Sequence, residues 1–90
     1  MRERYLEVTY RRGQPLVAYL YLPRRDGDRC VRVAREPSGM VVDLAEGDRA
    51  IGVEILDPQQ VTVKALNATL AKYAQPALDQ SELAPLLATA

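Results

Sequence analysis

Histidine is absent from this chain of 90 residues, and cysteine occurs once, as Cys30. The lack of histidine excludes Ser-His-Asp and Cys-His catalysis, together with any zinc site that uses a histidine ligand. A single cysteine cannot form an internal disulfide, and the alternating sequence around Cys30 predicts a small, half-buried strand residue. Any enzymatic chemistry would therefore depend on carboxylates, lysine or arginine.

Long apolar runs are also missing, and none approaches the roughly 20 residues that a membrane-spanning helix needs. The charged start, Met-Arg-Glu-Arg, lacks the apolar stretch of a signal peptide. We therefore expect no membrane association and a cytoplasmic location. The length leaves room for one small core, and an apolar share of 48% is typical of a folded domain rather than a disordered segment.

The formal net charge is zero, but the charges are unevenly distributed along the chain. Residues 1–35 carry +5 and residues 36–90 carry −5, an asymmetry that can mark a nucleic-acid-binding half. In a meander of strands, however, the pairs Arg11-Arg12 and Arg24-Arg25 lie in turns at opposite ends of the sheet, each near acidic residues. No continuous basic stripe results, so we expect no tight binding to nucleic acid.

Short alternating or apolar segments, separated by turn residues, indicate five strands. These segments are 5–10, 16–22, 29–35, 40–44 and 50–56. Segment 16–22 is apolar on both faces, which is typical of a central strand. No helical pattern lies between the strands, so the sequence predicts an α+β fold with an antiparallel β-meander and a C-terminal helix packed on one face.

The helix is predicted to run from about Thr62, which can cap its start, to about Tyr73. Its apolar stripe consists of Val63, Leu66, Leu70 and Tyr73. We expect this stripe to cover the sheet face formed by Leu6, Val8, Leu20, Leu22, Val31, Val33, Val42, Leu44, Ile51, Val53 and Ile55.

The end of the chain is predicted to form a tail, residues 76–90, after a single domain of residues 1–75. Pro76 ends the first helix. Asp79 and Glu82 have the spacing of a capping box, so a short second helix is expected over 79–89, although Pro85 lies within it.

Segments 40–44 and 51–57, joined by a turn that contains Gly47, resemble the signature of the domain of unknown function 2283 family of small bacterial β-rich domains. Its members typically read G-x-x-V-D-x-D-x-x-G and then I-V-G-I-E-I-L-D. Tyr10 and the segment 18–22 resemble the opening tyrosine and the next strand of the family, so the resemblance spans about residues 10–57. It implies a β-meander but no established activity or catalytic residues, and it raises a toxin-like protein as one candidate partner.

Three carboxylates, Asp43, Glu54 and Asp57, lie in the family-like region. Asp43 and Glu54 are expected to project from adjacent strands on the face opposite the core. One interpretation is a divalent-cation site or a carboxylate pair for acid–base work, which would make the chain a small-ligand-binding or enzymatic domain. The other interpretation is solvated charges paired with nearby arginines. Because no zinc or calcium ligand set and no phosphate-binding glycine motif is present, we predict no metal and no cofactor.

An interaction surface is predicted on the face of the central strand opposite the core, where Val17, Tyr19 and Tyr21 lie. One helix covers only one face of a sheet, so a partner, a second copy or the apolar tail must cover the other. The tail residues included in this surface are Leu83, Leu86 and Leu87. We therefore expect a protein-interaction or oligomerisation module, working as a homodimer and presenting a surface to another protein. Packing of the tail on its own sheet is the alternative.

Overall fold

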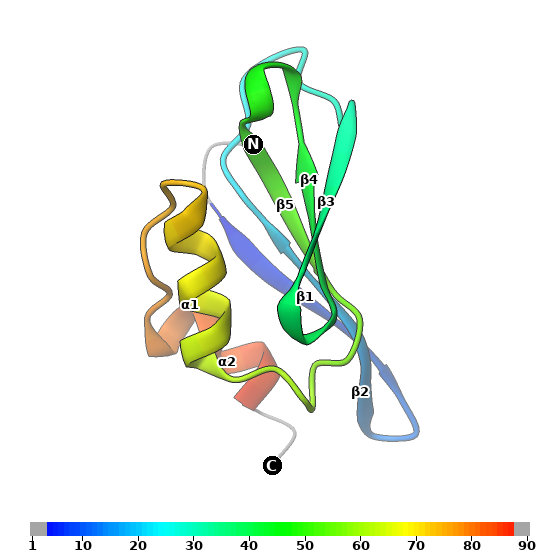
Figure 1. Ribbon diagram of the computed structural model, residues 1–90. Coiled ribbons are helices and arrows are strands. Elements are labelled where there is room, and N and C mark those ends of the chain that lie inside the picture. Colours follow the sequence, from blue (N-terminus) through cyan, green and yellow to red (C-terminus); the bar gives the residue numbers. More distant parts are fainter. Residues whose placement is uncertain (1–3, 88–90) are drawn as a thin grey trace.

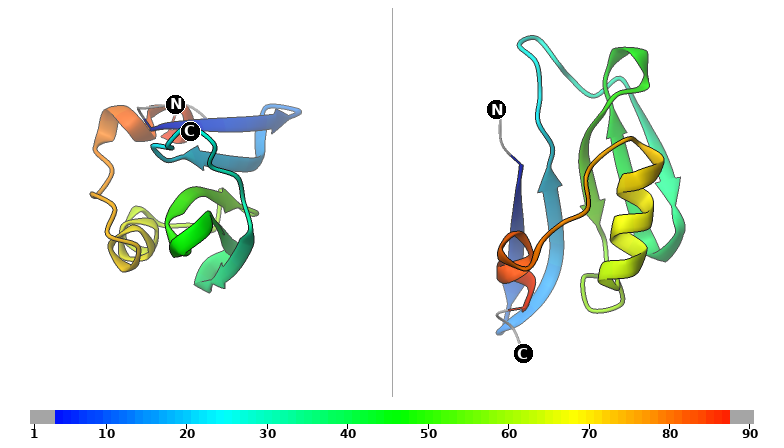
Figure 2. Two further views of the ribbon diagram at one scale, coloured as in Figure 1. Left: turned by 90° about the horizontal axis from the view of Figure 1, so that it is seen from above. Right: turned by 90° about the vertical axis from the view of Figure 1, so that its left-hand side faces the viewer.

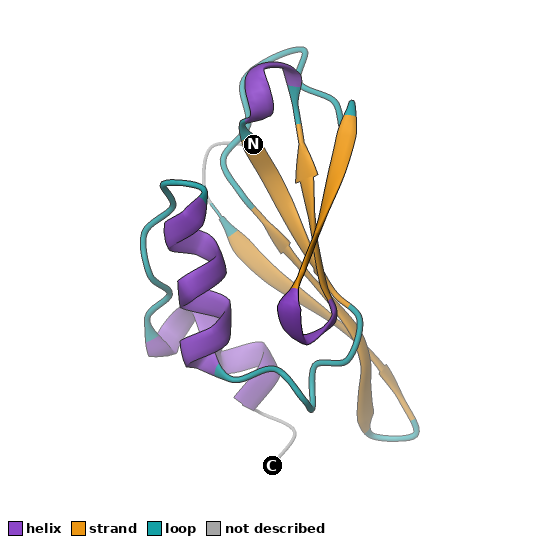
Figure 3. Ribbon diagram, in the orientation of Figure 1, coloured by secondary structure: helices purple, strands orange, loops and turns teal. Residues whose placement is uncertain are grey.

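The computed structural model describes residues 4–87, which form a five-stranded antiparallel sheet with two helices on one side of it (Figures 1 and 3). The strands are β1 Tyr5–Arg11, β2 Gln14–Tyr21, β3 Arg32–Glu36, β4 Met40–Leu44 and β5 Ala50–Ile55. The helices are α1 Val63–Lys72 and α2 Gln80–Leu87, and two single 3₁₀ turns occupy Pro37–Gly39 and Glu46–Asp48. The predicted α+β class, with five antiparallel strands and a C-terminal helix, is confirmed.

The strand order is β1-β2-β5-β4-β3, which differs from the consecutive order of a simple meander. After β2 the chain crosses to the far edge of the sheet, forms β3 and β4 there, and returns with β5 into the centre. β5 takes this place because five of its six residues are buried, so it gains most from neighbours on both sides. The crossing places the loop after β2 beside the start of β5, where the Leu22 N–H donates to the Ile51 carbonyl at 3.3 Å.

Both helices begin at the caps that the sequence predicts. The Thr62 hydroxyl oxygen accepts the Ala65 N–H at 3.0 Å at the start of α1. Before α2 the capping box is reciprocal, since the Glu82 N–H donates to the Asp79 carboxylate at 2.8 Å and the Asp79 N–H donates to the Glu82 carboxylate at 3.1 Å. α1 therefore begins where it was expected, and the second helix is present.

The core lies between the sheet and the two helices, where Leu66 and Leu70 of α1 are each only 1% exposed. Most of the expected sheet residues take part in it. Val31 and Val33 do not, because each is 51% exposed. The register explains this error, since Ala34 pairs with the core residue Val42, and Val33 is thereby turned to the opposite side.

Two smaller expectations are also wrong. Val63 is 42% exposed, because as the first residue of α1 it lies at the margin of the packed stripe. Cys30 lies in the loop before β3 and is exposed, because β3 begins only at Arg32.

The segment after residue 75 is part of the core rather than an appended tail. Leu78 and Leu83 are 7% and 3% exposed and belong to the same apolar cluster as Leu66 and Leu70. α2 lies beside β1, on the same side of the sheet as α1 (Figure 2). This segment therefore packs on its own sheet, but on the core side, and not over the face of Tyr19 and Tyr21 as the alternative interpretation expects.

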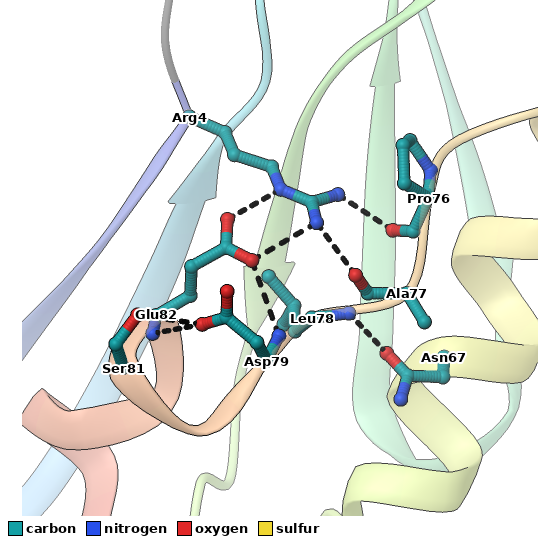
Figure 4. Close-up of polar contacts among 8 residues, drawn as sticks. All are labelled: Arg4, Asn67, Pro76, Ala77, Leu78, Asp79, Ser81 and Glu82. Atoms are coloured by element: carbon teal, nitrogen blue, oxygen red, sulfur yellow. Dashed lines mark hydrogen bonds and ion pairs between the residues drawn. The ribbon is translucent and has the colours of Figure 1, made fainter.

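Arg4, the residue directly before β1, forms hydrogen bonds with the segment after residue 75 (Figure 4). Its guanidinium donates to both carboxylate oxygens of Glu82, with N–O distances of 2.5 and 3.0 Å. It also donates to the carbonyls of Pro76 at 2.6 Å and Ala77 at 2.7 Å. Through these bonds Arg4, at the start of the described chain, holds residues 76–82 near its end.

Candidate functional site

The side of the sheet opposite the helices, here called the outer face, carries the residues that the sequence predicts for an interaction surface. Neither α1 nor α2 covers it (Figure 2). Strand pairing aligns its side chains in two rows across the sheet. One row is Tyr5, Tyr21, Gly52, Asp43 and Val33, and the other is Glu7, Tyr19, Glu54, Val41 and Arg35.

Three tyrosine rings pack together on the β1–β2 half of the outer face. The rings of Tyr5 and Tyr21 are stacked with centroids 4.5 Å apart, and the ring of Tyr19 meets Tyr21 edge-on at 4.7 Å. The Tyr21 hydroxyl donates to Glu7 at 3.4 Å, and the Arg24 guanidinium lies 5.9 Å from the Tyr21 ring centroid. Ring contacts of this kind hold each side chain in one orientation, so the cluster is a preformed surface.

Tyr19 reaches across β5 to the next strand, where its hydroxyl donates to Asp43 of β4 at 2.6 Å. The ring passes over Gly52, where a Cβ atom would lie 1.8 Å from the Tyr19 hydroxyl oxygen and 2.3 Å from Cζ. Glycine is needed here for space and not for an unusual backbone angle, since its φ is outside the positive range. A glycine in the middle of a buried strand is the signal by which the sequence marks this close approach.

The environment raises the pKa of two of these tyrosines, Tyr19 and Tyr21. Burial, followed by the hydrogen bond to Asp43, raises the pKa of Tyr19. The charge of Glu7 is the main cause that raises the pKa of Tyr21. At neutral pH Tyr19 and Tyr21 therefore offer apolar rings and neutral hydroxyl groups, a chemistry suited to contact with another surface.

The three predicted carboxylates do not come together. Asp43 and Glu54 share the outer face, but Asp43 pairs with Gly52 and Glu54 pairs with Val41, and Asp43 already accepts the Tyr19 hydroxyl. Asp57 lies in an exposed turn beyond the end of β5. Within residues 4–87 no group of three or more His, Cys, Asp or Glu side chains is placed to hold a metal ion.

Of the predicted tail residues, Leu83 does not extend the outer face. Leu83 is buried in the core on the opposite side of the sheet, so its assignment to an interaction surface is wrong. Its position follows from α2 packing beside β1, on the core side. The side chains of Leu86 and Leu87 lie outside the described residues.

Comparison of the chain with protein-family models, with curated proteins and with solved structures finds no match. The resemblance to the domain of unknown function 2283 family therefore stays a prediction. Neither described helix is long and apolar enough to pass through a membrane.

Proposed function

We propose that this chain is a small protein-interaction module that forms a homodimer through its outer face. The observation that carries the proposal is the packed tyrosine cluster on a sheet face that neither helix covers. Tyrosine is enriched at protein interfaces, where its ring provides contact area and its hydroxyl a hydrogen bond.

Preorganisation supports this use of the cluster. Tyr19 is held by Asp43, and Tyr21 is packed between Tyr5 and Tyr19. Side chains that are already ordered lose little rotamer entropy when a partner binds, so more of the contact energy appears as affinity.

A second copy is the occupant that the charge pattern of the face favours. In one row, Glu7 lies on the β1 edge and Arg35 on the β3 edge. A two-fold axis parallel to the central strand β5 would place the β1 edge of one copy over the β3 edge of the other. Glu7 would then face Arg35 twice, and Tyr5 would face the exposed Val33 twice. The same axis passes close to Glu54, which would face its own copy and repel it.

The proposal includes two expectations from the sequence, a cytoplasmic location and membership of the domain of unknown function 2283 family. A toxin-like or other protein on the outer face is the competing occupant. We propose no enzymatic role, because Asp43 serves as the acceptor for Tyr19 and no observation assigns chemistry to Glu54.

The oligomeric state, measured by light scattering over a wide concentration range, tests the proposal. We expect a dimer for the natural chain and a monomer for Tyr21→Lys. The matched control is Val63→Lys, which places the same charge on an exposed apolar residue of α1 and should leave the dimer intact. Glu54→Gln should tighten the dimer by removing the repulsion at the axis. A monomeric natural chain, or a dimer that survives in Tyr21→Lys, would refute the assignment.

A further inference from the structure

A surface cavity of about 340 Å³ lies between the loop after β2, the start of β5 and the end of α1. Three arginines line it: Arg24 and Arg25 from the loop after β2, and Arg49, the residue directly before β5. Tyr73 and Gln75 lie on the α1 side. The strand order creates this site, because only the crossing after β2 brings Arg24 and Arg25 next to Arg49.

The protein itself positions two of the three guanidinium groups. Arg49 donates through both terminal nitrogens to Asp28, at 2.9 and 2.5 Å. Arg24 donates through Nε to the Ile51 carbonyl at 3.3 Å and through Nη2 to the Tyr19 hydroxyl at 3.4 Å. Within residues 4–87, Nη1 of Arg24 and Nε of Arg49 have no hydrogen-bond acceptor, so each group keeps donors for a ligand.

Positive charge exceeds negative charge at the cavity. Among residues 4–87 no carboxylate belongs to its lining, and the nearby Asp28 is engaged by Arg49. Arg25 is exposed, and its side chain has no hydrogen-bond acceptor in the part of the chain that the structure describes. Near Tyr73, Lys72 pairs with Glu36 of β3 and Arg32 pairs with Asp48, and Glu36 also accepts the Tyr73 hydroxyl at 2.6 Å.

The partial negative charge at the C-terminal end of α1 is reduced where this end meets the cavity. The Gln75 N–H donates to the Leu70 carbonyl at 2.9 Å, and the Ala74 N–H donates to the Ala71 carbonyl at 3.2 Å. This is the pairing of a Schellman motif, which satisfies carbonyl groups that would otherwise repel an anion.

We propose that this cavity binds the oxyanion of a small molecule, a phosphate or a carboxylate group. Guanidinium groups present paired N–H donors that match both groups in geometry and charge. The volume lies at the lower end of the range for small-molecule sites. Arg24 connects the cavity to the outer face, since it also donates to the Tyr19 hydroxyl, whereas within residues 4–87 Arg25 and Arg49 donate no hydrogen bond to the tyrosine cluster.

The test is a titration of the full chain with inorganic phosphate and, separately, with citrate, at constant ionic strength because salt screens such contacts. The side-chain Nε–Hε resonances of the arginines are followed by NMR. Saturable shifts confined to Arg24, Arg25 and Arg49 are expected. Binding of phosphate alone assigns a phosphate ligand, and binding of citrate alone assigns a carboxylate ligand.

Two variants make the test specific. Arg25→Gln removes an exposed guanidinium that makes no hydrogen bond within residues 4–87, so the fold should be retained, and binding is expected to weaken roughly five-fold or more. Arg11→Gln is the matched control, because Arg11 is exposed at the far end of the β1–β2 hairpin and its loss should leave binding unchanged. No saturation with either anion, or equal effects of the two variants, would overturn the proposal.

Discussion

Replacement of Gly52 by alanine is expected to dismantle the link between β2 and β4 on the outer face. The new methyl group would occupy the position of the Tyr19 ring, since a Cβ atom at residue 52 lies 1.8 Å from the hydroxyl oxygen and 2.7 Å from Cε2. The ring must therefore swing away, and the 2.6 Å hydrogen bond to Asp43 is lost with it. The edge-on contact between Tyr19 and Tyr21 is lost as well.

The expected cost follows from three contributions to the free energy of unfolding. A hydrogen bond to a charged group contributes about 1.5–3 kcal/mol, and the half-buried position of Tyr19 favours the lower value. The contact between the rings adds about 0.5–1.5 kcal/mol. Alanine itself offsets about 0.5–1 kcal/mol, because glycine loses more backbone freedom on folding. The net destabilisation is therefore about 1–2.5 kcal/mol.

Urea denaturation of a double-mutant cycle measures this coupling directly. In a Tyr19→Ala background no ring opposes the new methyl group, so Gly52→Ala should become neutral or stabilise by up to about 1 kcal/mol. In this control background the destabilisation by Gly52→Ala is therefore absent or replaced by a stabilisation. If Gly52→Ala costs less than about 0.5 kcal/mol in the natural chain, or costs the same in both backgrounds, the ring does not lie over Gly52 as described.

Two further predictions concern the ion pairs that hold the chain ends and the turns. Arg4→Gln should lower the free energy of unfolding by about 1–3 kcal/mol, because it leaves the part-buried Glu82 carboxylate without its partner, and faster hydrogen exchange in α2 should accompany it; unchanged exchange would contradict the role of Arg4. The hydrogen bond with Arg49 lowers the pKa of Asp28 to about 2 from its ordinary 3.8. Asp28 therefore contributes stability that is present above about pH 5 and is lost as the pH falls toward 2, a dependence that urea midpoints should show and that Asp28→Asn should reduce; an identical pH profile in the variant would refute it.

Much of the local structure follows from neighbouring residues in the sequence. Thr62 begins α1 and the Asp79–Glu82 box begins α2 because a cap needs only side chains within one helical turn. The alternating segments place all five strands, with ends that shift by up to three residues. Segment 16–22 is apolar on both faces, which predicts a central strand with Tyr19 and Tyr21 on the face opposite the core. The register supports that face, and β2 is an interior strand, but β5 takes the centre of the sheet.

Contacts between distant residues required the tertiary structure. The sequence predicts an interaction face but not that Tyr19 crosses Gly52 to reach Asp43, because this depends on β5 lying between β2 and β4. Val33 was assigned to the core because alternation gives the period of a strand but not which parity faces inward.

The sequence shows the pair Arg24-Arg25, but it does not show that this pair lines a cavity. The sequence by itself determined the class of the fold, the caps and the tyrosine-bearing strand, since each depends on residues close together along the chain. Only the tertiary structure decided the strand order, the inward parity of β3 and the meeting of Arg24 and Arg25 with Arg49. The physical reason is that the strand order depends on the apolar burial summed over the whole sheet. A pattern within one short segment does not contain this information.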